Sequence, residues 1–299
     1  MKRIMEKRTL PTLIAEVGCN HKGDIEIAKE FITTAVNFCG VHHIKFQKRN
    51  NKTLLPDSQY NTPHPVPQNS YGATYGEHRE NLEFSLDQHR ELKAFCGQHG
   101  VTYSTSVWDI PSLEEIISLN PDYIKIPSAT NTHIELLRLA CEEFPGQIHV
   151  SLGMTTHLEE TQIVTLFHDT GRIKDLVLFA CTSGYPIEPT EACLFEITRL
   201  KEGYGDDVSA IGYSGHHNGI ALDIAAFTLG ADYIERHFTL DRTWKGTDHA
   251  ASLEPDGLRR VQRDLITCFS ALSKKPAEIL AIEEPQRAKL KWRSPDLSS

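Results

Sequence analysis

The sequence of 299 residues has no long apolar run and no excess of basic residues. It lacks any stretch of about 18 or more apolar residues, so we expect no membrane-spanning helix and no membrane partner. The opening residues MKRIMEKRTL lack the apolar core of a secretion signal. Because the net charge is -9, we do not expect the chain to bind nucleic acid.

Paired cysteines are also missing. The seven cysteines are scattered and no CxxC pair occurs, which argues against a disulfide framework and against a zinc–thiolate site. Several of them fall on apolar faces of helical segments, where a free cysteine behaves as a small hydrophobic residue. This usage is typical of a reducing compartment, so we expect a cytoplasmic protein.

No GxGxxG motif follows the first strand-like segment, which weakens the case for a dinucleotide-binding open sheet. The sequence contains instead a repeated unit, a short apolar run followed by a segment of helical periodicity. The strand-like runs are residues 12–18, 43–47, 102–107, 123–127, 148–152, 176–182, 210–214 and 233–237. The helical segments are residues 25–39, 86–99, 112–119, 133–143, 158–169, 190–202, 219–229 and 254–273. Eight such units in about 250 residues predict an α/β fold, the closed (β/α)8 or TIM barrel, with a doubly wound open sheet as the alternative.

The barrel is predicted to occupy residues 1–275 as a single domain, followed by a C-terminal tail at 276–299. The segment 48–83 interrupts the repeat after the second strand. It is rich in Asn, Pro, Gly and Tyr, and it is much longer than an ordinary connection between a strand and a helix. We expect it to form a lid or wall of the active site.

Polar residues gather at the carboxyl ends of the predicted strands, where barrel enzymes place their active sites. They are Glu16, Lys45, Gln47, Thr105, Lys125, Ser128, Ser151, Ser183, Tyr185, Ser214, His216 and His237, and Asp248 follows in the last loop. His216 and His237 end neighbouring strands, and neutral imidazole is a common ligand of divalent metals. The alternative is a pair of polar residues that end strands without binding a metal.

Lys45 and Lys125 lie within apolar runs, where an unpaired ammonium group costs several kcal/mol. A bound phosphate or carboxylate, shared with nearby hydroxyls, would compensate both lysines. A closed ion network with Glu16 or Glu235 is the alternative. Glu16 itself can be a general acid or base, or a salt-bridge partner.

These parts favour a metal-assisted reaction that joins a phosphorylated or carboxylated small molecule to a carbonyl compound. They also suit a metal-dependent hydrolase, or a barrel that binds a ligand without chemistry. The first strand ends in GCNH and not in the HxH pair often found in hydrolases of this fold, which favours the joining reaction. Asp248 and Tyr185 can also be explained without a function: Asp248 can cap a short turn, and Tyr185 can pack against its neighbours.

Six motifs stand out along the chain: IAEVGCNHKGD, IKFQK, TYGEHRENLEFS, CTSGYP, GYSGHHNGIA and ERHFTLDRTWKGTDHAASLEP. Together they resemble the sialic acid (N-acetylneuraminate) synthase family over nearly all of residues 10–273, and the last two are most like its animal-type branch. Members condense phosphoenolpyruvate with an N-acylhexosamine, or with its 6-phosphate, to give a nine-carbon ulosonic acid. The resemblance therefore implies a phosphoenolpyruvate-dependent transferase that forms a carbon–carbon bond. A deaminated or diamino sugar acceptor is the alternative.

The resemblance also implies roles for single residues. His216 and His237 would bind Mn2+ or Mg2+, and Glu16 would manage protons near the metal. Phosphoenolpyruvate would be held by Lys45, Thr105, Lys125, Ser128, Ser151, Ser183 and Ser214. The sugar would face Gln47, Asn69, Tyr185 and Asp248. A homodimer is expected.

The chain departs from the family pattern in two places. Family members commonly carry Gly and an acidic residue after the serine at position 128, whereas Ala129 and Thr130 stand here. The missing carboxylate leaves the choice of acceptor open. Many relatives also continue into an antifreeze-like domain that supplies an arginine to a neighbouring sugar site. We expect no such domain here and expect the 48–83 segment to close the site instead.

Overall fold

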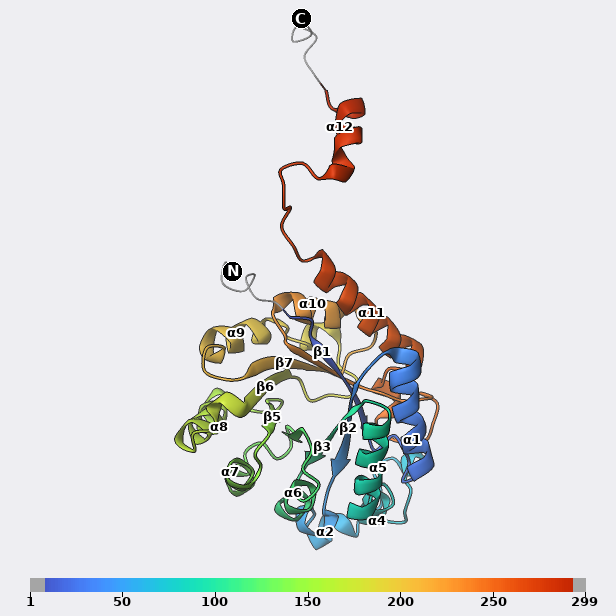
Figure 1. Ribbon diagram of the computed structural model, residues 1–299. Helices are drawn as coiled ribbons and strands as arrows, with labels where there is room; N and C mark the ends of the chain where they lie inside the picture. The colour runs from blue at the N-terminus through green and yellow to red at the C-terminus, as the bar shows by residue number, and fades with distance from the viewer. Residues whose placement is uncertain (1–8, 293–299) are drawn as a thin grey trace, which may run out of the picture.

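Residues 9–292, which the computed structural model describes, contain eight parallel strands that close into a barrel in sequence order (Figure 1). They are β1 (Thr12–Gly18), β2 (His43–Lys48), β3 (Thr102–Val107), β4 (Tyr123–Ile126), β5 (Gln147–Ser151), β6 (Leu176–Cys181), β7 (Ala210–Gly215) and β8 (Tyr233–His237). The ring is closed by β8 on β1, where Glu16 lies beside His237 in the register. The (β/α)8 prediction is confirmed, because an open sheet would leave two unpaired edges.

Helices surround the strands on the outside of the barrel (Figure 1). They are α1 (Ile25–Thr34), α5 (Leu86–Gln98), α6 (Ile110–Ile117), α7 (Ile134–Glu143), α8 (His157–Asp169), α9 (Phe195–Tyr204), α10 (Ala221–Leu229) and α11 (Pro255–Ala271), with 3-10 turns η4 (Ile173–Asp175) and η6 (His249–Ala251) between elements. Their first turns are fixed by side chains: Ser85 with Gln88, and Thr156 with Glu159, form capping boxes. Such caps satisfy amide groups that have no partner within the helix.

Two helices differ from the predicted segments. The segment 25–39 is α-helical only to Thr34 and ends in a π-helical turn, η2 (Ala35–Cys39), which stops at Gly40 with a φ of 69°. A residue without a β-carbon adopts this left-handed conformation at little cost. The segment 190–202 becomes α-helical only at Phe195, because a 3-10 turn, η5 (Pro189–Glu191), comes first and Cys193 has a φ of 45°.

Side chains alternate along each strand between the barrel interior and the layer that faces the helices. The lower interior is filled by a small cluster that includes Ile14, Tyr123 and Phe179. Two residues further along their strands, the same alternation brings Glu16 and Lys125 into the interior, both buried. The barrel therefore has an apolar floor beneath a layer of charged groups.

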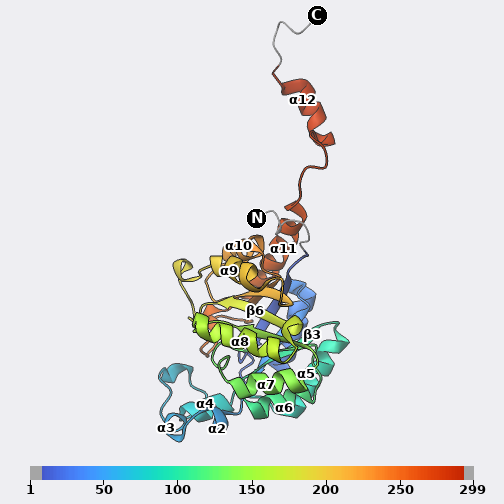
Figure 2. The same cartoon turned by 90° about the vertical axis from the view of Figure 1, so that its left-hand side faces the viewer.

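The segment after β2 holds several short helices: α2 (Asn51–Leu54), α3 (Asp57–Tyr60), η3 (Pro67–Asn69) and α4 (Tyr75–Glu80). Figure 2 shows α2, α3 and α4 together at one end of the barrel. The far end carries α11 and the chain that follows it. The long loop predicted after the second strand is therefore partly helical, and it lies over one barrel end.

Beyond α11 the chain leaves the barrel. The turn η7 (Ala281–Glu283) and α12 (Glu284–Leu290) stand apart from it in both views (Figures 1 and 2). Of the predicted tail, residues 293–299 lie outside the described residues, as do residues 1–8 of the predicted barrel domain. Within 9–292, no helix has both the length and the apolar character needed to cross a membrane.

Candidate active site

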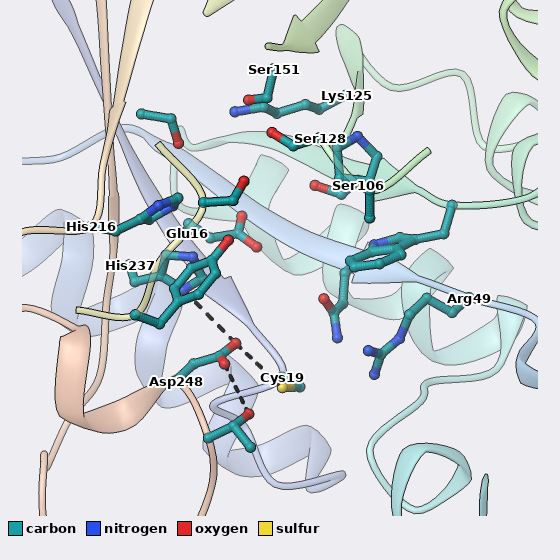
Figure 3. Close-up of a pocket in the computed structure, with 18 of the residues that line it drawn as sticks. Glu16, Cys19, Arg49, Ser106, Lys125, Ser128, Ser151, His216, His237 and Asp248 are labelled. Carbon is teal, nitrogen blue, oxygen red and sulfur yellow. Dashed lines mark hydrogen bonds and ion pairs between the residues drawn. The ribbon is translucent and has the colours of Figure 1, made fainter. Parts of the chain in front are cut away.

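A pocket of about 380 Å3 opens at the carboxyl ends of the strands, and residues of the 48–83 segment form part of its wall (Figure 3). Most residues that the sequence singled out lie on its surface: Glu16, Lys45, Gln47, Lys125, Ser128, Ser151, Ser183, Tyr185, Ser214, His216, His237 and Asp248. They come from strands far apart in sequence. The closed barrel brings them together because all eight strands end on the same rim.

Thr105 and Asn69 do not line this pocket. Thr105 faces away from it and donates a hydrogen bond of 2.6 Å to Tyr103 Oη. Because side chains alternate along a strand, the inward position on β3 belongs to Ser106, and a role of Thr105 in substrate binding stays a prediction. Asn69 ends the turn η3 in the long segment, outside the residues that form the pocket surface.

Two lysines and two glutamates form an ion network at the base of the pocket. Lys45 pairs with Glu16, lies 3.8 Å from Glu235 Oε1, and donates to Ser106 Oγ at 2.5 Å. Lys125 Nζ lies 2.7 Å from Glu235 Oε1. The ion network that the sequence left as an alternative is therefore present. Both lysines nevertheless also face the pocket, where an anion can reach them.

The two glutamates of this network differ in pKa. Burial raises the pKa of Glu16 to about 8, although Lys45 opposes the shift. Burial acts in the same direction on Glu235, but Lys125 and Lys45 together outweigh it and bring the pKa of Glu235 to about 2. Burial also lowers the pKa of Lys125. Glu16 is therefore the carboxyl group of this network that holds a proton near neutral pH, which is the state of a general acid.

Serine hydroxyls line the pocket near Lys125 (Figure 3). Ser128 Oγ accepts a hydrogen bond of 3.0 Å from the amide of Gly153. Ser183 Oγ is buried and has no hydrogen-bond partner in the described part of the chain. A β-carbon on Gly153 would lie 2.3 Å from Ser183 Oγ and 2.7 Å from Ser128 Oγ, so a larger residue would displace both hydroxyls. Buried hydroxyls without a protein partner suit the oxygen atoms of a bound anion.

His216 and His237 face each other with ring centres 5.4 Å apart. His216 Nδ1 donates to the carbonyl oxygen of Thr182 at 2.8 Å, which leaves Nε2 free as a ligand. His237 Nδ1 is buried, has no hydrogen-bond partner within residues 9–292, and lies 4.0 Å from Asp248 Oδ2. Burial lowers the pKa of His216 to about 3 and also lowers that of His237, so both rings are neutral. Neutral imidazole is the form that binds a metal.

The two imidazoles fit a divalent metal as part of its coordination shell. Across the described residues, no cluster of three or more His, Cys, Asp or Glu side chains could hold a metal alone. Two protein nitrogens would leave coordination positions for water and substrate. Open positions are typical of catalytic and not of structural metal sites.

Arg236 links the strand that ends in His237 to the loop that follows His216. Its guanidinium is 1% exposed, donates to the carbonyl oxygen of His217 at 2.7 Å and pairs with Asp223. Arg236 precedes His237 on β8, and His217 follows His216 after β7. The bond therefore ties the loop that follows one histidine to the strand that carries the other.

The GCNH segment after β1 has an anchoring role. Asn20 Nδ2 donates to the carbonyl oxygen of Phe238 at 2.8 Å and to Ser252 Oγ at 3.0 Å. Cys19 Sγ lies 3.7 Å from Asp248 Oδ2. These contacts hold the loop that carries Asp248 against the first strand.

The sequence did not identify several other residues of the pocket wall: Cys19, Arg49, His64, Tyr75, His78, Arg79, Ser106 and Trp108. Strand alternation could have found Ser106, and Arg49 directly follows β2. His64, Tyr75, His78 and Arg79 lie in turns and short helices, whose side chains no simple period places.

Comparisons with known proteins agree with this geometry. The chain matches the NeuB family over residues 31–276. It is 35% identical to the N-acetylneuraminate-9-phosphate synthase of Mus musculus, covering 93% of this chain and 76% of that protein. It is 32% identical to the N,N'-diacetyllegionaminic acid synthase of Campylobacter jejuni, covering 85% of this chain and 74% of that protein. The solved structure of N-acetylneuraminic acid synthetase from Leptospira borgpetersenii superposes with a TM-score of 0.78 at 27% identity, covering 95% and 93% of the two chains.

The fold and the site define a (β/α)8 barrel enzyme of the phosphoenolpyruvate-dependent condensing class. Within that class the chain belongs to the NeuB family, which includes the sialic acid synthases. The resemblance found in the sequence motifs is confirmed. Legionaminic and pseudaminic acid synthases are related branches, so the family alone leaves the sugar open.

Proposed function

We propose that the protein condenses phosphoenolpyruvate with N-acetylmannosamine, with a related hexose, or with the 6-phosphate of such a sugar, forming a sialic-acid-like nonulosonate and releasing phosphate. The observation that carries this proposal is that two buried lysines and several serine hydroxyls lie in the same pocket as two neutral imidazoles. The first group suits a small multiply charged anion and the second a divalent metal.

Phosphoenolpyruvate would lie at the base of the pocket. Lys45 and Lys125 would pair with its phosphate and carboxylate. The hydroxyls that would complete the site are those of Ser106, Ser128, Ser151, Ser183 and Ser214. The unpartnered Ser183 Oγ supports this placement, because a buried hydroxyl gains a partner when the anion binds.

Glu16 and the two histidines would act on the acceptor. His216 and His237 would hold Mn2+ or Mg2+, and such a cation polarises a carbonyl oxygen when bound. Glu16, protonated near neutral pH, would give its proton to the aldehyde oxygen as C3 of phosphoenolpyruvate bonds to the aldehyde carbon. The electrons for that bond come from the C2–C3 double bond.

The second half of the reaction releases phosphate. Water adds at C2, and Glu16, now ionised, would accept the proton that this water loses. The C2–O bond to phosphate then breaks as the C2 carbonyl forms, and phosphate leaves with the proton of the C2 hydroxyl. One carboxyl group thus serves first as acid and then as base.

The acceptor sugar would contact Gln47, Tyr185 and Asp248 on the upper wall. The Tyr185 ring lies 4.3 Å from that of His216, which supports a contact near the reacting end of the sugar. Asn69 does not belong to the proposed contacts, because it lies away from the pocket surface. We also propose that the enzyme works in the cytoplasm as a homodimer; the free cysteines support a reducing compartment.

A phosphate-release screen tests the function. The protein is incubated with phosphoenolpyruvate, Mn2+ or Mg2+, and one of N-acetylmannosamine, its 6-phosphate, mannose or a diamino hexose. We expect phosphate release that requires both an acceptor and the metal, with a nonulosonate identified by mass. Cleavage of a single substrate without phosphoenolpyruvate would indicate a hydrolase, and calorimetric binding without phosphate release would indicate a non-catalytic binder.

Replacing Ser106 tests which residue of β3 faces the substrate. Ser106→Ala is expected to raise KM for phosphoenolpyruvate about 10- to 100-fold, because a hydrogen bond to a charged group contributes about 1.5–3 kcal/mol. The matched control is Thr105→Val, which removes the bond to Tyr103 and should cost only about 1 kcal/mol of stability. A KM change in the Thr105 variant and none in the Ser106 variant would reverse the assignment.

A further inference from the structure

The pocket has a second cationic region, which we call the arginine zone: Arg49, Arg79 and Trp108. The guanidinium carbons of Arg49 and Arg79 lie 5.5 and 5.6 Å from the centre of the Trp108 ring, and all three residues line the pocket. Figure 3 shows Arg49 across the pocket from His216 and His237. The zone is therefore separate from the histidine pair.

Positive charge in this zone is only half balanced. Arg79 is 8% exposed, and within residues 9–292 no ion pair joins it to an acid. Glu83 is committed to Arg49, because its two oxygens accept from Arg49 Nε and from the Arg49 amide. Glu77 is exposed and accepts from the amides of Ala73 and Thr74. One carboxylate thus faces two guanidinium groups, and a buried cation without a counter-ion is costly.

Neighbouring titratable groups do not supply the missing charge. Burial lowers the pKa of His78 to about 4, so this ring is neutral. Burial, with Arg49 adding to it, lowers the pKa of Arg79 to about 10, which still leaves the guanidinium charged at neutral pH. Asp248 feels the charge of Arg49, but among the described residues its ion-pair contact is with His237 and with neither guanidinium.

Hydrogen-bond donors of the zone also lack acceptors. Arg49 Nη2 and Trp108 Nε1 are both buried without a partner among the described residues. Together with the Arg79 guanidinium, they present several N–H groups to one pocket. An oxyanion with several oxygens satisfies such a set, and guanidinium groups match phosphate geometry well.

We infer that the arginine zone binds the phosphate monoester at the far end of the acceptor sugar, with Arg79 as the residue that makes the enzyme specific for an aldose 6-phosphate. The inference rests on the proposed condensation, in which phosphoenolpyruvate occupies the lysines at the base and the acceptor carbonyl lies at the histidines. An acceptor held at its carbonyl end then directs its other end across the pocket. Arg79 is a binding residue for the phosphate, with Arg49 oriented beside it by Glu83.

Acceptor kinetics test the inference with a matched pair of sugars, N-acetylmannosamine and N-acetylmannosamine 6-phosphate. We expect wild-type kcat/KM to be at least about 100-fold higher for the phosphorylated sugar, as charge-assisted bidentate contacts allow. Arg79→Gln should lower kcat/KM for the phosphorylated sugar at least about 30-fold more than for the unphosphorylated one. Arg79→Lys should recover part of the loss, and Arg90→Gln, which alters an exposed arginine paired with Asp87, should alter neither value.

The outcomes separate the two proposals. Equal wild-type use of both sugars, or an equal loss on both in Arg79→Gln, overturns the inference while phosphate release still supports the condensation. A larger effect of Arg79→Gln on KM for phosphoenolpyruvate than on the acceptor would assign the zone to that substrate and also overturns it. Absence of phosphate release with every acceptor contradicts the proposed function itself. If Arg79→Gln does not fold, the wild-type comparison of the two sugars decides.

Discussion

Replacing His216 or His237 with alanine is expected to lower kcat/KM for the condensation by at least about 100-fold while leaving the fold intact. Each ring is neutral because of burial and faces the other across 5.4 Å, so the loss of one leaves a single imidazole for the metal. Supporting groups around a metal are themselves worth about 10- to 100-fold, and a direct ligand should be worth no less. Calorimetry with Mn2+ measures the same loss without relying on activity.

Two controls accompany the histidine variants. His168→Ala removes a ring that is 77% exposed on α8 and should change neither metal binding nor turnover. Circular dichroism and thermal unfolding should show that each variant keeps its barrel. Full activity in a chelator-treated His216→Ala, His237→Ala double variant would remove the metal role from these residues.

Lys125→Met is expected to affect both catalysis and stability. Loss of the ammonium group should raise KM for phosphoenolpyruvate about 100-fold, because a charge-assisted contact is lost. It should also lower the free energy of unfolding by about 3–5 kcal/mol, because Glu235 keeps a buried charge whose nearest cation was 2.7 Å away. Steady-state kinetics and urea denaturation measure the two effects.

The double variant Lys125→Met, Glu235→Gln separates the two effects. Removing the carboxylate charge should restore most of the lost stability, since no unpaired buried charge remains at that position. It should not restore use of phosphoenolpyruvate. An unchanged KM and kcat in Lys125→Met would refute the anion site, and recovery of both properties in the double variant would show that the lysine acts only through stability.

The strands were predictable because their physical situation is uniform. A parallel strand covered by helices is apolar on both faces, and each predicted run ends within one residue of the observed strand. The first residue of a helix was harder to predict where a turn precedes the helix, as Pro189–Glu191 precedes α9. Neither a turn nor a residue with positive φ produces a periodic pattern of apolar residues in the sequence.

The site was predictable where it follows from the strands and not where it depends on the loops. His216 and His237 were found because they end strands, and Lys45 and Lys125 because charges interrupt apolar runs. Thr105 lies outside the pocket because alternation decides between adjacent residues, and the motif alone does not state which one faces inward. Arg79 was missed because its burial depends on how α4 packs in the 48–83 segment.

The buried contact of Arg236 with His217 and Asp223 has a consequence for how this enzyme can diverge. In the half of the pocket that holds the histidines, it joins the loop after His216 to the strand that ends in His237, so moving these two elements apart would break buried bonds. The opposite half belongs to short helices connected by turns, where substitutions disturb few barrel contacts. Substitutions that change the accepted sugar can therefore accumulate in the 48–83 segment while the residues of the reaction stay the same. This separation suits a family whose members make several different nonulosonates.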